Sequence, residues 1–370
     1  MKKRLKDVLD YEQPTKYIVD SQNYSEDFMT PVLTAGKSFI LGYTDETEGV
    51  YEASKNPVII FDDFTSASKY VDFDFKVKSS AMKILHLVNP KDSLRYVYYA
   101  MQKIDYVPFS HKRLWISDYC NFEIELPDSS IQNRVVADLD TIQKAIDIKR
   151  KQLEDLDELM KSKFQEMFGD PVENEKGWDV KSFGELATFK NGLNYSPKGD
   201  GVKYYIIGVS DFQSRSEIGC NEELLSIYLE GTLNEEYLLQ DDDILFVRSN
   251  GNKQLIARNI LVKTNMLEVT FSGFCIRARI VKGDVLPCFV NSLLKIPSSH
   301  DALTMKGRGC NISNLNQAIL NDFGIIVPPI EQQKVFAEFV RKADAANAII
   351  KQEISDLEEL MDSKMDEYFG

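Results

Sequence analysis

The chain has 370 residues, enough for two or three domains that each bury a core. Its apolar, aromatic and charged fractions are 43%, 11% and 28%, as in ordinary globular proteins, and no apolar run approaches the roughly 20 residues of a membrane span. The formal net charge of −14 disfavours a nucleic-acid binder but does not exclude one, because net charge governs solubility and long-range steering rather than what one groove can bind.

The cysteines are odd in number and scattered, and none has CxxC spacing. This pattern argues against a zinc site or a disulfide framework and predicts a protein of a reduced compartment, the cytoplasm. The five positions are Cys120, Cys220, Cys275, Cys288 and Cys310.

Residues 1–128 are predicted to form a first, strand-rich head. Apolar runs rich in β-branched and aromatic residues predict strands at 57–61, 82–88 and 119–126. Residues 129–169 are then predicted to form a long helix, because Pro127 precedes the segment and Gly169 ends it. Its apolar residues recur in steps of three and four over nearly five heptads, which is typical of a coiled-coil seam about 55 Å long.

Residues 170–177 form a polar linker to a second head at 178–328, with strands expected at 203–209, 243–247, 273–281 and 323–327. Residues 329–370 repeat the long helix after Pro328 and Pro329. This last segment carries much of the excess acid, ten acidic against five basic residues from 331 onward. The heads therefore have more freedom to build a local basic face than the net charge indicates.

The two halves are related by duplication. Residues 155–169 return as 356–370 at an offset of 201, with 10 of 15 residues identical. Residues 3–9 are echoed by 181–187 at an offset of 178, so the second head carries about 23 extra residues, which we expect in loops. We therefore predict an α+β fold in which two pseudo-repeated mixed α/β heads are joined by two long helices packed as an antiparallel coiled coil.

No catalytic constellation is evident. The chain has neither a GxGxxG dinucleotide motif nor a GxxxxGK[ST] phosphate loop, and His86, His111 and His300 stand alone. Asp62–Asp63 and Asp241–Asp243 could bind a metal, but acidic turn residues at strand ends are the simpler interpretation. We expect no bound metal and no catalysis.

Polar loops with basic residues recur at matched places in both heads. Residues 248–254 offer arginine, asparagine and glutamine, the side chains that bind the edges of guanine and adenine. Lysines and hydroxyls elsewhere could bind phosphate, which gives affinity without sequence information. The candidate DNA contacts are Thr65, Ser66, Ser68, Lys69, Lys76, Lys78, Ser79, Lys112 and Arg113 in the first head, and Arg248, Ser249, Asn250, Asn252, Lys253, Gln254, Lys306, Arg308 and Asn311 in the second.

Two motifs carry a family resemblance. Pro328-Pro329-Ile330-Glu331-Gln332-Gln333-Lys334 opens the second helix, matched by Pro127 and Gln132-Asn133-Arg134 at the first, where the proline pair is reduced to Pro127–Asp128. Phe168-Gly169-Asp170-Pro171 followed by Lys176-Gly177-Trp178 leads into the second head. With the order head, helix, head, helix, the whole chain resembles the specificity (S) subunit of a type I restriction-modification system.

The resemblance implies a subunit without catalysis of its own, in which each head is a target recognition domain for one half of an asymmetric bipartite DNA site. The helices would set the spacer and dock methyltransferase (M) subunits, with restriction (R) subunits joining the complex. S-adenosylmethionine, ATP and Mg would bind to those partners. The alternative from another class is a protein-interaction scaffold with two binding heads on a coiled coil.

Overall fold

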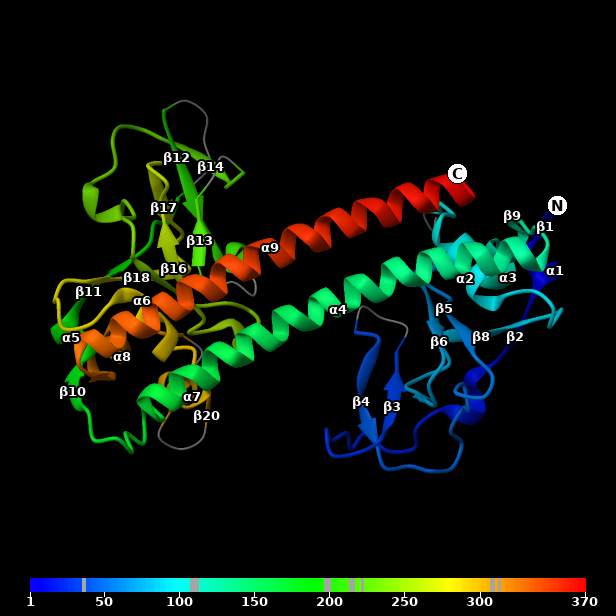
Figure 1. Cartoon of the computed structure of the whole chain (residues 1–370), viewed down its shortest axis with the longest axis horizontal. Helices are drawn as coiled ribbons and strands as arrows, with labels where there is room; N and C mark the ends of the chain where they lie inside the picture. The colour runs from blue at the N-terminus through cyan, green and yellow to red at the C-terminus, as the bar shows by residue number, and fades with distance from the viewer. Residues whose placement is uncertain are drawn as a thin grey trace. The chain divides into compact units, whose positions relative to one another are not determined.

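The computed structural model describes residues 1–34, 38–106, 113–195, 201–212, 217–220, 223–306, 310–311 and 314–370. The chain divides into a first unit, Met1–Arg150 with Gln352–Gly370, and a second unit, Lys151–Lys351. Both expected long helices are present, as α4 (Ser129–Phe168) and α9 (Ile330–Phe369) (Figure 1). Each of these helices contributes residues to both units, because the boundary between the units falls within it.

The first unit contains a four-stranded sheet in the order β2-β8-β5-β6, a three-stranded sheet β4-β3-β7 and a pair β1-β9. The core under the larger sheet includes Leu5, Phe61, Trp115 and Leu139. The elements are β1 (Lys2–Arg4), α1 (Leu5–Val8), β2 (Leu9–Glu12), β3 (Thr30–Leu33), β4 (Ile40–Thr44), β5 (Val58–Asp62), β6 (Ser68–Val71), β7 (Lys76–Val77), β8 (Met82–Leu87), α2 (Leu94–Gln102), α3 (Leu114–Ser117) and β9 (Glu123–Glu125).

The second unit repeats these sheets as β11-β18-β15-β16-β13, β14-β12-β17 and β10-β21. Strand β13 and the pair β19-β20 have no counterpart in the described part of the first unit. The elements are β10 (Asp179–Ser182), α5 (Phe183–Leu186), β11 (Ala187–Asn191), β12 (Val202–Ile207), β13 (Glu217–Gly219), β14 (Ser226–Leu229), β15 (Ile244–Val247), β16 (Asn259–Lys263), β17 (Val269–Phe271), β18 (Cys275–Ile280), α6 (Pro287–Leu293), α7 (Pro297–Thr304), β19 (Met305–Lys306), β20 (Cys310–Asn311), α8 (Gln317–Asp322) and β21 (Gly324–Val327).

Strand pairing supports the duplication in both direction and register. Strand β3 pairs antiparallel with β4 and parallel with β7, as β12 does with β14 and β17. The pairs Leu9–Leu87 and Ala187–Ile280 are equivalent, so β8 and β18 are related by an offset of 193. One expectation was wrong in part: of the strand expected at 119–126, only β9 forms, because Tyr119–Asn121 is a 3-10 turn whose tyrosine packs into the aromatic core.

A buried glutamine fastens the start of each long helix. Gln132 donates from Nε2 to the Pro127 carbonyl (2.9 Å) and accepts the Ser93 N–H through Oε1 (2.7 Å). Gln333 repeats this arrangement with the Pro328 carbonyl (2.8 Å) and the Leu286 N–H (2.8 Å). The proline-rich helix opening seen in the sequence therefore has a physical role: it presents a carbonyl to a buried amide that also ties the preceding loop to the helix.

The end of α4 is closed by a glycine turn. Gly169 has a φ of +76°, the left-handed conformation that favours glycine after a helix. The Trp178 indole N–H donates to the Phe168 carbonyl (2.9 Å), and Asn174 bonds both the N–H and the carbonyl of Trp178. The Phe-Gly-Asp-Pro to Gly-Trp segment is thus a compact turn that fixes where the second head begins.

Helices α4 and α9 contact each other within each unit. In the first unit the Tyr368 hydroxyl donates to Asp138 (2.7 Å), and Lys149 pairs with Glu353 (2.7 Å), so the two segments run antiparallel there. In the second unit the Phe336 ring lies 5.5 Å from those of Phe164 and Phe168. Within the described ranges, no helix is long and apolar enough to cross a membrane.

Candidate nucleic-acid interface

Three loops of the first unit meet at one end of its larger sheet. The Asp63 N–H, just after β5, donates to the Ala81 carbonyl before β8 (3.2 Å). The Leu114 N–H, at the start of α3, donates to the Asp63 carbonyl (3.0 Å). We call Asp63, Ala81 and Leu114 the first junction, because backbone hydrogen bonds join three segments there that are far apart in the sequence.

The second unit has the same junction. The Arg248 N–H after β15 donates to the Phe274 carbonyl before β18 (2.8 Å), and the Leu315 N–H donates to the Arg248 carbonyl (2.9 Å). Arg248, Phe274 and Leu315 form the second junction. They follow Asp63, Ala81 and Leu114 by 185, 193 and 201 positions. The offset of 193 is that of β8 and β18, and the offset of 201 is that of the long helices. Asp63 and Arg248 therefore occupy equivalent positions.

Equivalent backbones carry different chemistry at the two junctions. Asp63 is buried: its Oδ1 accepts the Trp115 N–H (3.0 Å), and its Oδ2 lies 3.2 Å from the Nζ of Lys83, which is also buried. Arg248 is half-buried, and its Nη1 lies 3.4 Å from the Gly273 carbonyl, a weak contact. The same position is thus part of the core in one unit and a guanidinium near the surface in the other.

Several predicted contacts gather around the first junction. Thr65 and Ser66 lie in the turn after β5, where the Thr65 hydroxyl donates to Asp62 Oδ2 (2.6 Å) and Ser66 takes a φ of +61°. Arg113 is exposed immediately before α3, and Ser79 is exposed before β8. These four residues are the part of the first set that the fold brings together at this end of the sheet.

Other predicted contacts of the first unit are less suited to DNA. Lys76 is buried, and its ammonium contacts Glu46 Oε2 (2.6 Å) and the Glu48 carbonyl (2.7 Å), so it is not available to a phosphate. Ser68 is buried and accepts the Gln102 amide (2.8 Å). We remove both from the candidate interface. Lys69 is exposed on β6, and the half-buried Lys78 donates to the Tyr24 hydroxyl (3.3 Å).

The loop after β15 has the predicted polar residues near the surface. Ser249 and Asn250 are half-buried, and Asn252, Lys253 and Gln254 are exposed. Asn250 Oδ1 accepts the Asn252 N–H (2.8 Å), and Asn252 Oδ1 accepts the Gln254 N–H (3.0 Å). The two asparagine side chains therefore shape the loop, and the exposed side chains of Lys253 and Gln254 take no part in these hydrogen bonds.

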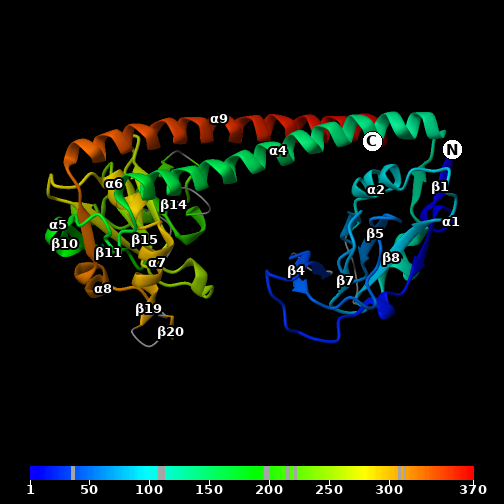
Figure 2. The same cartoon turned by 60° about the horizontal axis from the view of Figure 1, so that its bottom comes forward.

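The chain returns to the second junction after a short hairpin. Lys306 lies on β19 and Asn311 on β20, which pair antiparallel on the side of the second unit away from α4 and α9 (Figure 2). Lys112 and Arg308 lie outside the described residues. Among the residues that are described, no group of three or more His, Cys, Asp or Glu side chains could hold a metal ion.

Sequence reasoning missed the turn at 272–274. A Cβ on Gly273 would lie 2.1 Å from Asn194 Oδ1, so only glycine lets this turn approach the loop after β11. The Gly273 N–H donates to the Leu193 carbonyl (2.7 Å). This contact brings the exposed side chains of Asn194 and Phe274 to the second junction beside Arg248. No local pattern signals these residues, because the contact joins segments about 80 residues apart.

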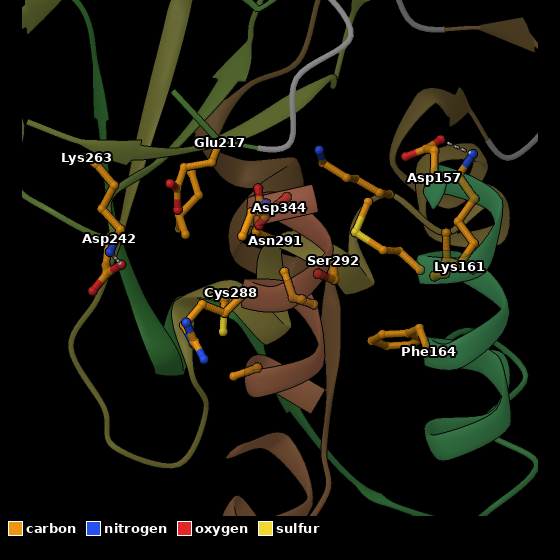
Figure 3. Close-up of a pocket in the computed structure, with 18 residues that line it drawn as sticks. Asp157, Lys161, Phe164, Glu217, Asp242, Lys263, Cys288, Asn291, Ser292 and Asp344 are labelled. Atoms are coloured by element: carbon orange, nitrogen blue, oxygen red, sulfur yellow. Dashed lines mark hydrogen bonds and ion pairs between the residues drawn. The ribbon is translucent and has the colours of Figure 1, made fainter. Parts of the chain in front are cut away.

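A cavity of about 560 Å³ lies within the second unit, between α4, α6 and α9 (Figure 3). Two of its charged pairs are Lys263–Asp242 (2.5 Å) and Lys161–Asp157 (2.8 Å). Burial raises the pKa of Glu217 and lowers that of Lys295 to about 8.

The first unit has larger side chains at the equivalent positions. Arg95 Nε lies 2.9 Å from Asp140, its guanidinium stacks 4.4 Å from the Tyr70 ring centroid, and the Tyr99 hydroxyl donates to Asp140 (2.5 Å). The equivalents of Arg95, Tyr99 and Tyr70 in the second unit are Cys288, Ser292 and Leu261. All three of these smaller side chains line the cavity, so they contribute to it as a packing difference between the repeats.

Comparisons with known proteins agree on one family. Residues 175–359 match the family described as type I restriction modification DNA specificity domain. The chain is 32% identical to the EcoR124I/EcoR124II type I restriction enzyme specificity subunit of Escherichia coli, over 92% of this chain and 85% of that one. It is 25% identical to the StySPI specificity subunit of Salmonella potsdam, over 60% and 50% of the two chains.

Solved structures show the same fold. The type I restriction-modification S subunit from M. genitalium aligns over all of this chain and 96% of its own, with a TM-score of 0.54 and 14% identity. A chain from a structure on the complex assembly and conformational transition of the type I R-M system aligns over all of this chain and 97% of its own, with a TM-score of 0.53 and 15% identity.

Proposed function

The chain belongs to the type I restriction-modification specificity subunits, which determine DNA sequence specificity, and from this membership we propose that each of its two units reads one half of a bipartite DNA site. The observation that supports this division is the pair of junctions. They share strand order and backbone hydrogen bonds, yet carry different side chains, Asp63 against Arg248. A repeated frame with unlike loops is suited to two unlike half-sites.

The long helices have a separate role in this proposal. Helices α4 and α9 pack as an antiparallel coiled coil that sets the spacer between the half-sites and docks methyltransferase subunits. Restriction subunits join that complex, and the partners bind S-adenosylmethionine, ATP and Mg. The chain itself binds DNA and does not catalyse a reaction.

Mapping of methylated bases tests the function. DNA from cells that carry this chain with its methyltransferase subunits is compared with DNA from cells that lack the chain. We expect methylation at one bipartite sequence with two different half-sites, present only when the chain is present. Methylation that does not depend on the chain would contradict the proposal.

Arg248 gives a more local prediction. If its guanidinium binds a base edge, R248A should weaken binding to the target by about 1–3 kcal/mol and relax one base position of one half-site. Titration of labelled duplexes measures the loss, and methylation mapping identifies the position. The control is K282A, an exposed lysine beyond the far end of β18, which should bind normally. An equal loss on unrelated DNA would make Arg248 a phosphate contact instead.

The helices give a prediction about the spacer. Four residues inserted after Arg150 and four after Lys351, equivalent positions at an offset of 201, lengthen both helices by about 6 Å and keep their register matched. We expect methylation mapping to show a spacer longer by about two base pairs, at roughly 3.4 Å per step, with both half-sites unchanged. An altered half-site with the original spacer would show that the helices do not position the heads.

A further inference from the structure

Each unit exposes one phenylalanine at its junction. Phe274 is 62% exposed and supplies the carbonyl that accepts the Arg248 N–H. Phe64 is 49% exposed and directly follows Asp63. Single exposed apolar residues are common on protein surfaces, so neither residue would be informative alone.

The informative feature is that the two phenylalanines come from different strands. Phe64 follows β5, and the equivalent residue in the second unit is Ser249. Phe274 precedes β18, and its equivalent in the first unit is Ala81. The residue that supplies the ring therefore changes between the repeats, while an exposed ring beside the junction is kept. Core packing does not account for a ring that remains so largely outside the core.

The backbone holds both rings at the surface. The Phe64 N–H donates to Asp62 Oδ1 (2.8 Å), and Phe274 lies in the turn held against Leu193 through Gly273. Each ring thus projects from a fixed loop rather than from a free end. Little conformational entropy would be lost when such a ring contacts a ligand.

We propose that Phe274 and Phe64 recognise thymine, by apolar contact with its C5 methyl group in the major groove, one in each half-site. Phenylalanine is among the side chains that make this contact, and thymine is the one standard DNA base that presents a methyl group in the major groove. In the second unit the neighbouring Arg248 would bind the adjacent base. This inference rests on the proposed function, because it assigns a role within the same DNA interface.

Uracil provides the test, because it is thymine without the methyl group. Duplexes carry the target mapped for the wild-type complex, and each thymine of the half-sites is replaced in turn by uracil. For the wild-type complex we expect about fivefold to tenfold weaker binding at one replaced thymine in each half-site. F274A should lose the response to uracil in one half-site only, and F64A in the other, with the affinity for the thymine duplex reduced to that for uracil.

Two variants serve as controls. M266A removes a fully exposed apolar side chain at the opposite end of β17 and should behave like wild type. F274L keeps an apolar side chain and should restore part of the response. Unfolding curves of F274A and F64A should match wild type, because neither ring belongs to a hydrophobic core cluster.

Several results would overturn the assignment. These are half-sites without a thymine, an F274A complex that still responds to uracil, or an equal loss on thymine and uracil duplexes, which would indicate stacking or a wedge. A wild-type complex without a methylated target would instead contradict the proposed function, so the two failures are distinguishable.

Discussion

Replacing Lys83 with methionine should destabilise the first unit by about 3–5 kcal/mol, because the Asp63 carboxylate would remain buried without its counter-charge. Lys83 Nζ and Asp63 Oδ2 lie 3.2 Å apart with almost no solvent exposure. Neither atom has a hydrogen-bond partner within the described part of the chain, so the Asp63 carboxylate depends on Lys83, whose ammonium also lies 5.2 Å from the Tyr11 ring centroid. The Asp63 carbonyl and N–H make the hydrogen bonds of the first junction. K83M should therefore also weaken sequence-specific binding to one half-site and leave binding to the other unchanged.

The measurement can be confined to one unit. The chain has two tryptophans, Trp115 in the first unit and Trp178 in the second. In a W178F background, fluorescence during urea unfolding reports on Trp115. The backbone N–H of this residue donates to Asp63 Oδ1. The exposed Lys91 provides the control K91M, which should unfold like its parent.

The double variant D63N/K83M separates charge from packing. It removes both charges while the asparagine can still accept the Trp115 N–H, so most of the stability should return. A K83M variant within 1 kcal/mol of wild type would show that the ion pair contributes little.

Replacing Gln333 with alanine should cost the second unit about 3 kcal/mol or more. Its buried amide makes hydrogen bonds to the Pro328 carbonyl, the Asp284 carbonyl (2.9 Å) and the Leu286 N–H. Alanine would leave these backbone groups without partners in a buried site, where each unsatisfied group costs about 1–3 kcal/mol. Hydrogen exchange should show faster exchange of the Leu286 amide and of the first turn of α9.

The adjacent Gln332 is exposed, so Q332A is the matched control and should change stability little. Gln132 makes the equivalent contacts in the first unit, so Q132A should have a similar effect there. If Q333A and Q332A changed stability equally, the hydrogen bonds of the buried Gln333 amide would not contribute to stability.

The sequence predicted the features that depend on local rules. Proline cannot lie in the interior of a helix and glycine favours the left-handed turn after one, so α4 and α9 begin and end within a residue of the expected positions. The repeat offsets also predicted the matched loops, because duplicated segments fold alike. The echo at 3–9 and 181–187 proved to be a strand and a short helix in both units.

What the sequence did not predict depends on contacts between distant segments. Lys76 was a candidate for phosphate binding, and nothing beside it in the sequence signals that Glu46, thirty residues earlier, would pair with it in the interior. Phe274 was missed for the same reason, since only the folded chain places it beside Arg248. A candidate DNA contact can be proposed from residue type, but its exposure is decided by tertiary structure.

The division of the chain into units has a consequence for its synthesis on the ribosome. The first unit includes Gln352–Gly370, and its core takes in Met365, with Met361, Tyr368 and Phe369 packed against it. These residues are translated about 200 positions after the rest of that unit. At roughly 5–20 residues per second, the wait is about 10–40 s. The first unit therefore cannot be completed until the whole second unit has been translated, and the second unit can assemble its own core before the first is complete.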